Sequence, residues 1–240
     1  MSTQKNRGKE AKDDIHFSTP NKALLKNAVD DMHYLLTRGY SEKNALHAVG
    51  TRYKLTQRQL KALQGMAAPE EHIAICQQKS VSVNDLKGKE LVVDGFNIMI
   101  LLESLLSQAF LFKGLDGCYR DLSEVHGTYK MVNQTPMAIS CISDFHTKYK
   151  IGKILWIFDK PVSNSGRIKQ QLETFAEEKG LDWKVMLENN ADEAIIQKGE
   201  IVLSSDAYVI ANAVNWFNLI TFLVETEKIP ATTFDVTHDA

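Results

Sequence analysis

The sequence predicts an α/β protein with a mostly parallel central sheet, flanking helices and a small N-terminal helical domain. Three observations support this fold class. Apolar residues recur at helical spacing between residues 16 and 68, short apolar runs alternate with helical patterns after residue 88, and three of those runs end in an aspartate. Strands that alternate with helices are typical of parallel sheets with right-handed crossovers.

Four segments are expected along the 240 residues. Residues 1–15 are polar and predict a disordered tail. Residues 16–68 form a small helical domain, residues 69–87 are a linker, and residues 88–240 make up the α/β domain.

Three helices are expected in the helical domain. Thr19 and Pro20 place a capping hydroxyl before a proline at the first helical position, and Gly39 ends that helix. A second helix begins near Ser41. A third follows residues 56–59, which fit a capping box.

Charge is unevenly distributed between the two parts of the chain. Residues 1–70 hold 12 Lys and Arg against 7 Asp and Glu, whereas residues 71–240 hold 16 against 23. The basic excess favours an approach of the helical domain to a polyanion such as nucleic acid. A solvated helical face explains it almost as well, and the bundle could instead pack on the second domain or form a homodimer. The basic residues near its turns are Arg38, Arg52, Lys54, Arg58 and Lys61.

Five apolar runs predict the strands of the α/β domain, with a further short strand near Val81 and Val83. These runs are Leu91–Val93, Ile154–Phe158, Trp183–Leu187, Ile201–Leu203 and Leu219–Phe222. The helices between them are expected at residues 98–109, 136–149, 167–179, 191–197 and 206–214. Asp116-Gly117 is a strong hairpin signal between residues 110–112 and 118–120.

Aspartates stand at the carboxyl ends of three predicted strands. Asp94, Asp159 and Asp206 each follow an apolar run, and Gly95 permits a tight turn after the first. If the strands are parallel neighbours, the three carboxylates converge on one edge of the sheet, where ligands bind in open α/β folds. Their mutual repulsion favours a hard cation, Mg²⁺ or Mn²⁺. Each aspartate could equally be the N-cap of the next helix.

Several classes of protein are disfavoured. No apolar run reaches the roughly 20 residues that span a bilayer, and the polar N-terminus lacks the apolar core of a signal peptide. Cys76, Cys118 and Cys141 have no CxxC spacing, which indicates neither a disulfide framework nor a zinc site. There is no phosphate-loop motif and no nucleophile elbow. We therefore expect a cytoplasmic protein with no membrane partner.

Four short motifs together carry a resemblance. Residues 94–97 (DGFN), 158–159 (FD), 191–193 (ADE) and 204–206 (SSD) resemble the dispersed acidic signature of the PIN and NYN nuclease-like superfamily, over roughly residues 88–225. That resemblance implies a PIN-like fold, Mg²⁺ or Mn²⁺ as cofactor, and cleavage of RNA. The whole chain is also similar to an uncharacterised family that joins such a domain to an N-terminal helical one.

The resemblance implies a catalytic set and an ion site. The catalytic residues are Asp94, Asp159, Asp192 and Asp206, of which Asp94, Asp159 and Asp206 hold the metal and Asp192 is a fourth ligand or positions water. A protein that binds RNA, a nucleotide or a partner without cutting is the alternative on the same scaffold.

Other polar residues are candidates for substrate binding or accessory roles. Asn97 could orient Asp94 or a phosphate oxygen. Ser163, Ser165 and Arg167 begin a helix and could seat a phosphate or simply cap that helix. The accessory candidates are Glu103, for which a solvated surface role is expected, Glu193, and His126, for which a packing role is expected.

Overall fold

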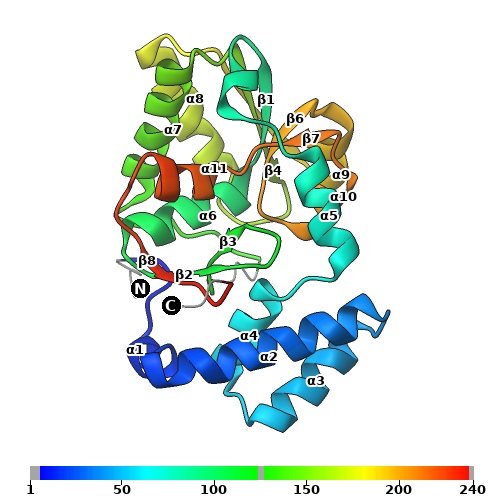
Figure 1. Cartoon of the computed structure of the whole chain (residues 1–240). Coiled ribbons are helices and arrows are strands. Elements are labelled where there is room, and N and C mark those ends of the chain that lie inside the picture. Colours follow the sequence, from blue (N-terminus) through cyan, green and yellow to red (C-terminus); the bar gives the residue numbers. More distant parts are fainter. Residues whose placement is uncertain (1–5, 124–126, 238–240) are drawn as a thin grey trace.

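The computed structural model describes residues 6–123 and 127–237. Its first helices form a layer at one end of the molecule, separate from the α/β part (Figure 1). They are α1 (Asp13–His16), α2 (Thr19–Thr37), α3 (Glu42–Tyr53) and α4 (Gln57–Met66). The predicted capping box of the third main helix is present, since the Gln59 backbone N–H donates to Thr56 Oγ1 and the Thr56 N–H donates to Gln59 Oε1. The predicted N-terminal helices are therefore present.

The central sheet has five strands in the order β5-β4-β1-β6-β7, and every pairing between them is parallel. The strands are β1 (Glu90–Asp94), β4 (Lys153–Asp159), β5 (Trp183–Glu188), β6 (Ile201–Leu203) and β7 (Asn215–Trp216). The predicted fold class, α/β with a parallel sheet, is confirmed.

Helices cover both faces of this sheet. They are α6 (Gly95–Leu106), α7 (Thr135–Tyr149), α8 (Ser165–Lys179), α9 (Ala191–Lys198) and α10 (Ala207–Asn212). Alternate residues of β1 enter different cores: Leu91 and Val93 pack with residues of α6, α7 and α8, whereas Val92 packs with Ile195 and Val209 of α9 and α10. This alternation follows from the two-residue period of a strand, and burial on both faces explains the continuous apolar runs.

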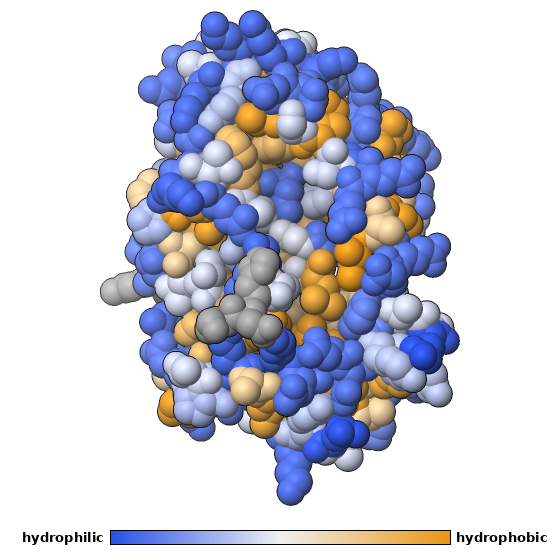
Figure 2. All heavy atoms as spheres, in the orientation of Figure 1, coloured by the Kyte–Doolittle hydropathy of each residue, from blue (hydrophilic) through white to orange (hydrophobic). Residues whose placement is uncertain are grey.

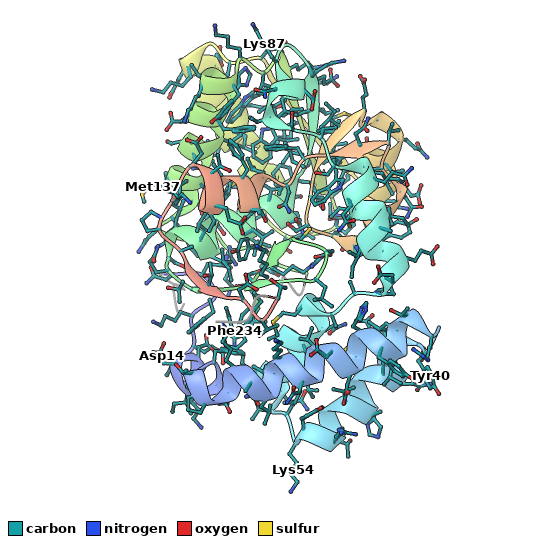
Figure 3. All side chains as sticks on the ribbon, viewed as in Figure 1. Asp14, Tyr40, Lys54, Lys87, Met137 and Phe234 are labelled. Atoms are coloured by element: carbon teal, nitrogen blue, oxygen red, sulfur yellow. The ribbon has the colours of Figure 1, made fainter. Side chains whose placement is uncertain are left out.

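A second, three-stranded sheet joins the helical layer to the α/β part. It contains β2 (Phe110–Lys113), β3 (Tyr119–Arg120) and β8 (Thr232–Phe234), in the order β3-β2-β8. The antiparallel β2–β3 pair is the predicted hairpin. Phe112 and Phe234 pack against Phe17 and the buried side chains of α2 to α4, and Phe234 lies between the two layers in Figure 3. The two parts therefore share a hydrophobic core.

Three expectations for short elements were wrong. The expected linker contains helix α5 (Glu70–Lys79), and the expected strand near Val83 is a 3₁₀-helix, η1 (Val83–Leu86). The expected last strand is helical: α11 (Leu219–Thr221) continues into a π-turn, η2 (Phe222–Thr226). Short apolar runs are ambiguous between strand and buried helix, and here the fifth strand position is taken by Asn215–Trp216.

The exposed face in Figure 2 is mostly hydrophilic, with hydrophobic residues scattered over it. Within the described ranges, none of the helices combines the length and apolar character needed to cross a bilayer.

Residues 6–15 do not form the disordered tail that the polarity of residues 1–15 predicts. Arg7 is 4% exposed and its guanidinium forms an ion pair of 2.7 Å with Glu103 of α6, which is fully buried. Arg7 also donates to the Lys130 carbonyl at 2.7 Å and lies over the Tyr129 ring. The Tyr129 hydroxyl donates to Glu103 as well. Glu103 therefore has no solvated surface role: it is a buried carboxylate that anchors residues 6–16.

Removing Arg7 tests this anchor. Arg7→Ala leaves the Glu103 carboxylate buried without its charge partner, which typically costs about 3–5 kcal/mol. Urea unfolding should show that loss, whereas Lys9→Ala, which removes a surface ion pair of 3.8 Å with Asp14, should change stability by less than about 0.5 kcal/mol. If both substitutions changed the free energy of unfolding by equally small amounts, residues 6–16 would not be anchored by Arg7 and Glu103.

Candidate functional site

The carboxyl ends of the central strands point toward the helical layer. Lys87, which precedes β1, lies at the far end of the molecule from that layer (Figure 3). The parallel register places Asp94 of β1 opposite Ile157 of β4, and Val93 opposite Leu203 of β6. The residues that follow these positions, Asp159 and Asp206, therefore reach the same edge of the sheet as Asp94.

Asp94 is the most buried of the four predicted catalytic carboxylates. Its Oδ2 atom accepts a hydrogen bond of 2.7 Å from the Ser204 hydroxyl. Burial raises the pKa of Asp94 to about 7; the Ser204 hydrogen bond opposes this rise, and the negative charges of Asp206 and Asp192 add to it. Asp94 stands at the N-cap position of α6 but makes no side-chain capping hydrogen bond of standard geometry, and the Asn97 backbone N–H lowers its pKa. The capping interpretation therefore holds for the position of Asp94 but not for a standard capping bond.

The other carboxylates interact with one another through charge. Burial raises the pKa of Asp192, and the charges of Asp206, Asp159 and Glu193 raise it further. Burial also raises the pKa of half-buried Asp159, against a hydrogen bond from the Ala191 backbone N–H. Charge therefore couples Asp94 to Asp192 and Asp206, and Asp192 to Asp206 and Asp159.

Asp206 has a second role. Its Oδ1 atom accepts hydrogen bonds from the backbone N–H groups of Tyr208 and Val209, at 2.8 and 3.0 Å, and so caps α10. The capping interpretation holds for this aspartate. Its Oδ2 atom takes no part in these two capping bonds. Glu193 lies at the rim, where its Oε1 accepts from the Tyr208 hydroxyl at 2.8 Å.

Gly95 serves close packing here rather than a tight turn. It is the first residue of α6, and its φ angle does not lie in the left-handed region. A Cβ atom at this position would lie 2.5 Å from the Phe158 ring and 2.7 Å from the Ile157 carbonyl oxygen. A glycine therefore lets α6 begin directly against β4, which holds Asp94 at the sheet edge.

A cleft of about 360 Å³ opens beside Asp206, between the sheet edge and the helical layer, and Asp94, Asp159 and Asp192 are not among its lining residues. The sheet side contributes Asn97, Ser205 and Asp206, and helix α4 contributes Lys61 and Gln64. Asn97 is fixed by its Oδ1 atom, which accepts from the Ser205 backbone N–H at 2.9 Å. The cleft is thus built from both parts of the chain.

Arg120 closes one side of this cleft and was not singled out by the sequence. Its guanidinium donates to both carboxylate oxygens of Asp116, at 2.6 and 3.0 Å, to the Gly65 carbonyl at 2.9 Å and to the Ser205 carbonyl at 3.0 Å. No local signal marks this residue, because its partners lie in three separate segments.

The other predicted binding residues lie elsewhere. The Ser165 hydroxyl donates to the Lys160 carbonyl at 3.2 Å, and the Ser163 backbone N–H donates to Gly127. Arg167 lines a different cavity, of about 590 Å³, between α8 and the start of α7. These three residues are not among those that line the carboxylate cleft. His126 lies outside the described residues.

Comparison with known proteins places the chain in a family. A family model described as "Domain of unknown function (DUF5616)" matches residues 83–222, more than half of the chain. The chain belongs to the DUF5616 family. A model described as "Protein of unknown function (DUF434)" matches residues 24–79 of this DUF5616 protein. The predicted resemblance to an uncharacterised family with a helical front is thereby confirmed.

The DUF5616 protein also has an archaeal relative. The uncharacterised protein MJ0935 of Methanocaldococcus jannaschii is 30% identical over 190 residues, which cover 78% of this chain and 88% of the relative. No solved structure matches the chain.

The raised pKa of Asp94 predicts how the stability of this DUF5616 protein depends on pH. Between the ordinary value of 3.8 and the folded value of about 7, the native carboxyl keeps a proton that the unfolded one has lost. Without added metal, the melting temperature should therefore fall as the pH rises from 4 to 7 and then level off. Each unit of pKa difference is worth about 1.4 kcal/mol.

Two variants of β1 test whether Asp94 causes this pH dependence of the melting temperature. Asp94→Asn should make the fall of the melting temperature with pH shallower, because an amide binds no proton in this pH range. Asp159 and Asp192, whose pKa values are also raised, should retain part of the slope. Glu90→Gln, at the opposite end of the same strand, should keep the wild-type slope. Parallel pH profiles for wild type and Asp94→Asn would contradict the assignment.

Proposed function

We propose that this DUF5616 protein is a divalent-metal-dependent ribonuclease of PIN or NYN type, which hydrolyses phosphodiester bonds at the carboxylate edge. The observation that carries the proposal is the buried Asp94 carboxylate, whose pKa is raised to about 7 beside Asp192 and Asp206. Clustered carboxylates at the carboxyl end of a parallel sheet are a typical ligand crevice. The three free cysteines fit a reducing compartment, the cytoplasm.

The residues fit a hard divalent cation. Among the described residues, the groups that act most strongly on Asp94 are acidic or neutral. Oxygen donors of carboxylates suit Mg²⁺ or Mn²⁺, and Asp94, Asp159, Asp192 and Asp206 would hold the ion. It would supply Lewis-acid chemistry, polarising a phosphate oxygen and lowering the pKa of water.

The surrounding residues position the carboxylates and the substrate. Ser204 fixes Asp94 through its hydroxyl, and the same Ser204 Oγ accepts from the Asp206 backbone N–H at 3.0 Å. This shared serine couples two carboxylates of the site. Because Asn97 Oδ1 is used by Ser205, its amide N–H groups are the part of that side chain that could donate to a phosphate oxygen.

The helical layer supplies the basic side of the cleft, but not through the arginines near its turns. Arg58 is held by Asp13 at 2.8 Å and by the Gly8 carbonyl at 2.7 Å, with a side chain only 12% exposed. Arg38 lies over the Tyr34 ring and Arg52 pairs with Asp31. Lys61 lines the cleft beside Asp206, and from that position we assign it the contact with RNA phosphate.

One observation favours a second candidate, a protein that binds RNA in this cleft without cutting it. The Oδ1 atom of Asp206 is already used to cap α10. In the described part of the chain, no three of the edge carboxylates have oxygens that all lie within 4.8 Å of one another. The tests below separate binding from cleavage.

Asp94→Asn tests the catalytic role. The amide keeps the shape of the carboxylate but removes one ligand charge, so Mn²⁺-dependent cleavage of a fluorescent RNA should fall by about 100-fold or more, and each factor of ten corresponds to about 1.4 kcal/mol. In chelator, the melting temperature of the variant at pH 7 should equal or exceed that of wild type, since like-charge repulsion is relieved. Glu90→Gln, prepared in the same way, controls for contaminating ribonuclease. Undiminished cleavage by Asp94→Asn would remove the proposed activity.

Lys61→Gln tests the phosphate contact. Loss of one contact with single-stranded RNA should weaken binding and reduce the slope of log affinity against log salt by about 0.7. Lys43→Gln on α3 is the matched control, since Lys43 borders a separate cavity with His47 and Leu60. Fluorescence anisotropy in chelator measures binding alone. Identical salt slopes for both variants would show that the cleft does not hold RNA.

A further inference from the structure

A second group of metal-ligating side chains lies away from the carboxylate edge. His72 and Cys76 are one turn apart on α5, and Asp116 lies in the β2–β3 hairpin. Cys76 Sγ is 3.3 Å from His72 Nε2, and Asp116 Oδ2 is 3.4 Å from the same nitrogen. Among the described histidines, cysteines and acidic residues, these form the group of three whose donor atoms all lie within 4.8 Å of one another.

Hydrogen bonding accounts for only part of this arrangement. The Nε2 atom of a histidine carries either one hydrogen or one lone pair. It can donate to Asp116 or accept from the Cys76 thiol, but it cannot do both. A catalytic relay does not explain it either, because a relay histidine contacts its nucleophile and its orienting acid through different ring nitrogens.

We propose that His72, Cys76 and Asp116 bind a divalent ion of the zinc class. One nitrogen, one sulfur and one carboxylate oxygen are the mixed donor set that zinc takes and magnesium does not. Ligand atoms about 2.0–2.3 Å from a tetrahedral zinc ion lie roughly 3.3–3.6 Å apart. The two measured separations from Nε2, 3.3 and 3.4 Å, match that spacing.

The surroundings support an ion at this place. His72 and Asp116 line a cavity of about 390 Å³ between α2, α4 and α10, which gives an ion a path from solvent. Three protein ligands leave a fourth position toward that cavity for water or another small ligand. Arg120 donates to both oxygens of Asp116, including at 2.6 Å the Oδ2 atom that faces His72, and so fixes the orientation of the carboxylate, as outer partners of metal ligands do. On binding, the Cys76 thiol releases its proton to solvent.

The proposed site would join α5 to the hairpin. These elements are distant in sequence, and Asp116 also holds Arg120, which borders the carboxylate cleft. A metal bound only to the native state raises the melting temperature. The inference is independent of the proposed nuclease activity.

Cobalt substitution tests the site directly. The full chain, freed of metal with chelator and then titrated with Co²⁺, should develop a thiolate-to-cobalt charge-transfer band and the intense visible bands of tetrahedral cobalt. Equimolar Zn²⁺ should abolish both. Cys76→Ser should lose the charge-transfer band, and His72→Asn should bind Co²⁺ more than about 100-fold more weakly, since even outer partners of a ligand are worth about 10–100-fold.

Cys141→Ser is the matched control, because Cys141 lies on α7 and is only half buried. It should retain the wild-type spectrum. Circular dichroism checks that each variant is folded, and His72→Asn decides the question if the buried Cys76→Ser does not fold. A wild-type protein without the charge-transfer band, a band that survives in Cys76→Ser, or unchanged affinity in His72→Asn would overturn the proposal.

Discussion

The contact between Arg120 and Asp116 is the interaction on which the arrangement of the molecule depends. The guanidinium binds both carboxylate oxygens of Asp116 and also the carbonyls of Gly65 and Ser205. One side chain therefore ties the end of α4, the hairpin and the loop after β6 together. Bidentate arginine–carboxylate pairs combine charge with fixed geometry. With Asp116 only 2% exposed, loss of either partner would leave a buried charge uncompensated.

The two candidate sites lie on either side of this contact. Arg120, Gln64 and Ala207 line both the cleft beside Asp206 and the cavity beside His72. The cleft offers hard oxygen donors and the cavity offers a nitrogen, a sulfur and one carboxylate. These donor sets favour different classes of ion. A chain with both sites would separate a catalytic ion from a structural one by the chemistry of its side chains.

Local sequence patterns predicted most of the fold. The strands at Leu91–Val93, Ile154–Phe158 and Trp183–Leu187 could be predicted because burial on both faces demands continuous apolar runs. The capping box after Thr56 could be predicted because its two hydrogen bonds link residues three positions apart. Helix α11 could not, because a short apolar stretch fits a strand or a helix until its neighbours decide, and α5 could not, because its mostly polar sequence has no clear apolar period.

The sequence by itself determined the parallel sheet and the placement of Asp94, Asp159 and Asp206 at strand ends, since both follow from local periodicity and the short connections of α/β folds. Only the tertiary structure decided what each charge does. Glu103 meets Arg7 from 96 residues away, and His72 of α5 meets Asp116 of the hairpin. Pairing of charges depends on distances in space. Those distances are set by packing between segments that are far apart in the sequence, and no local sequence pattern predicts which segments will meet.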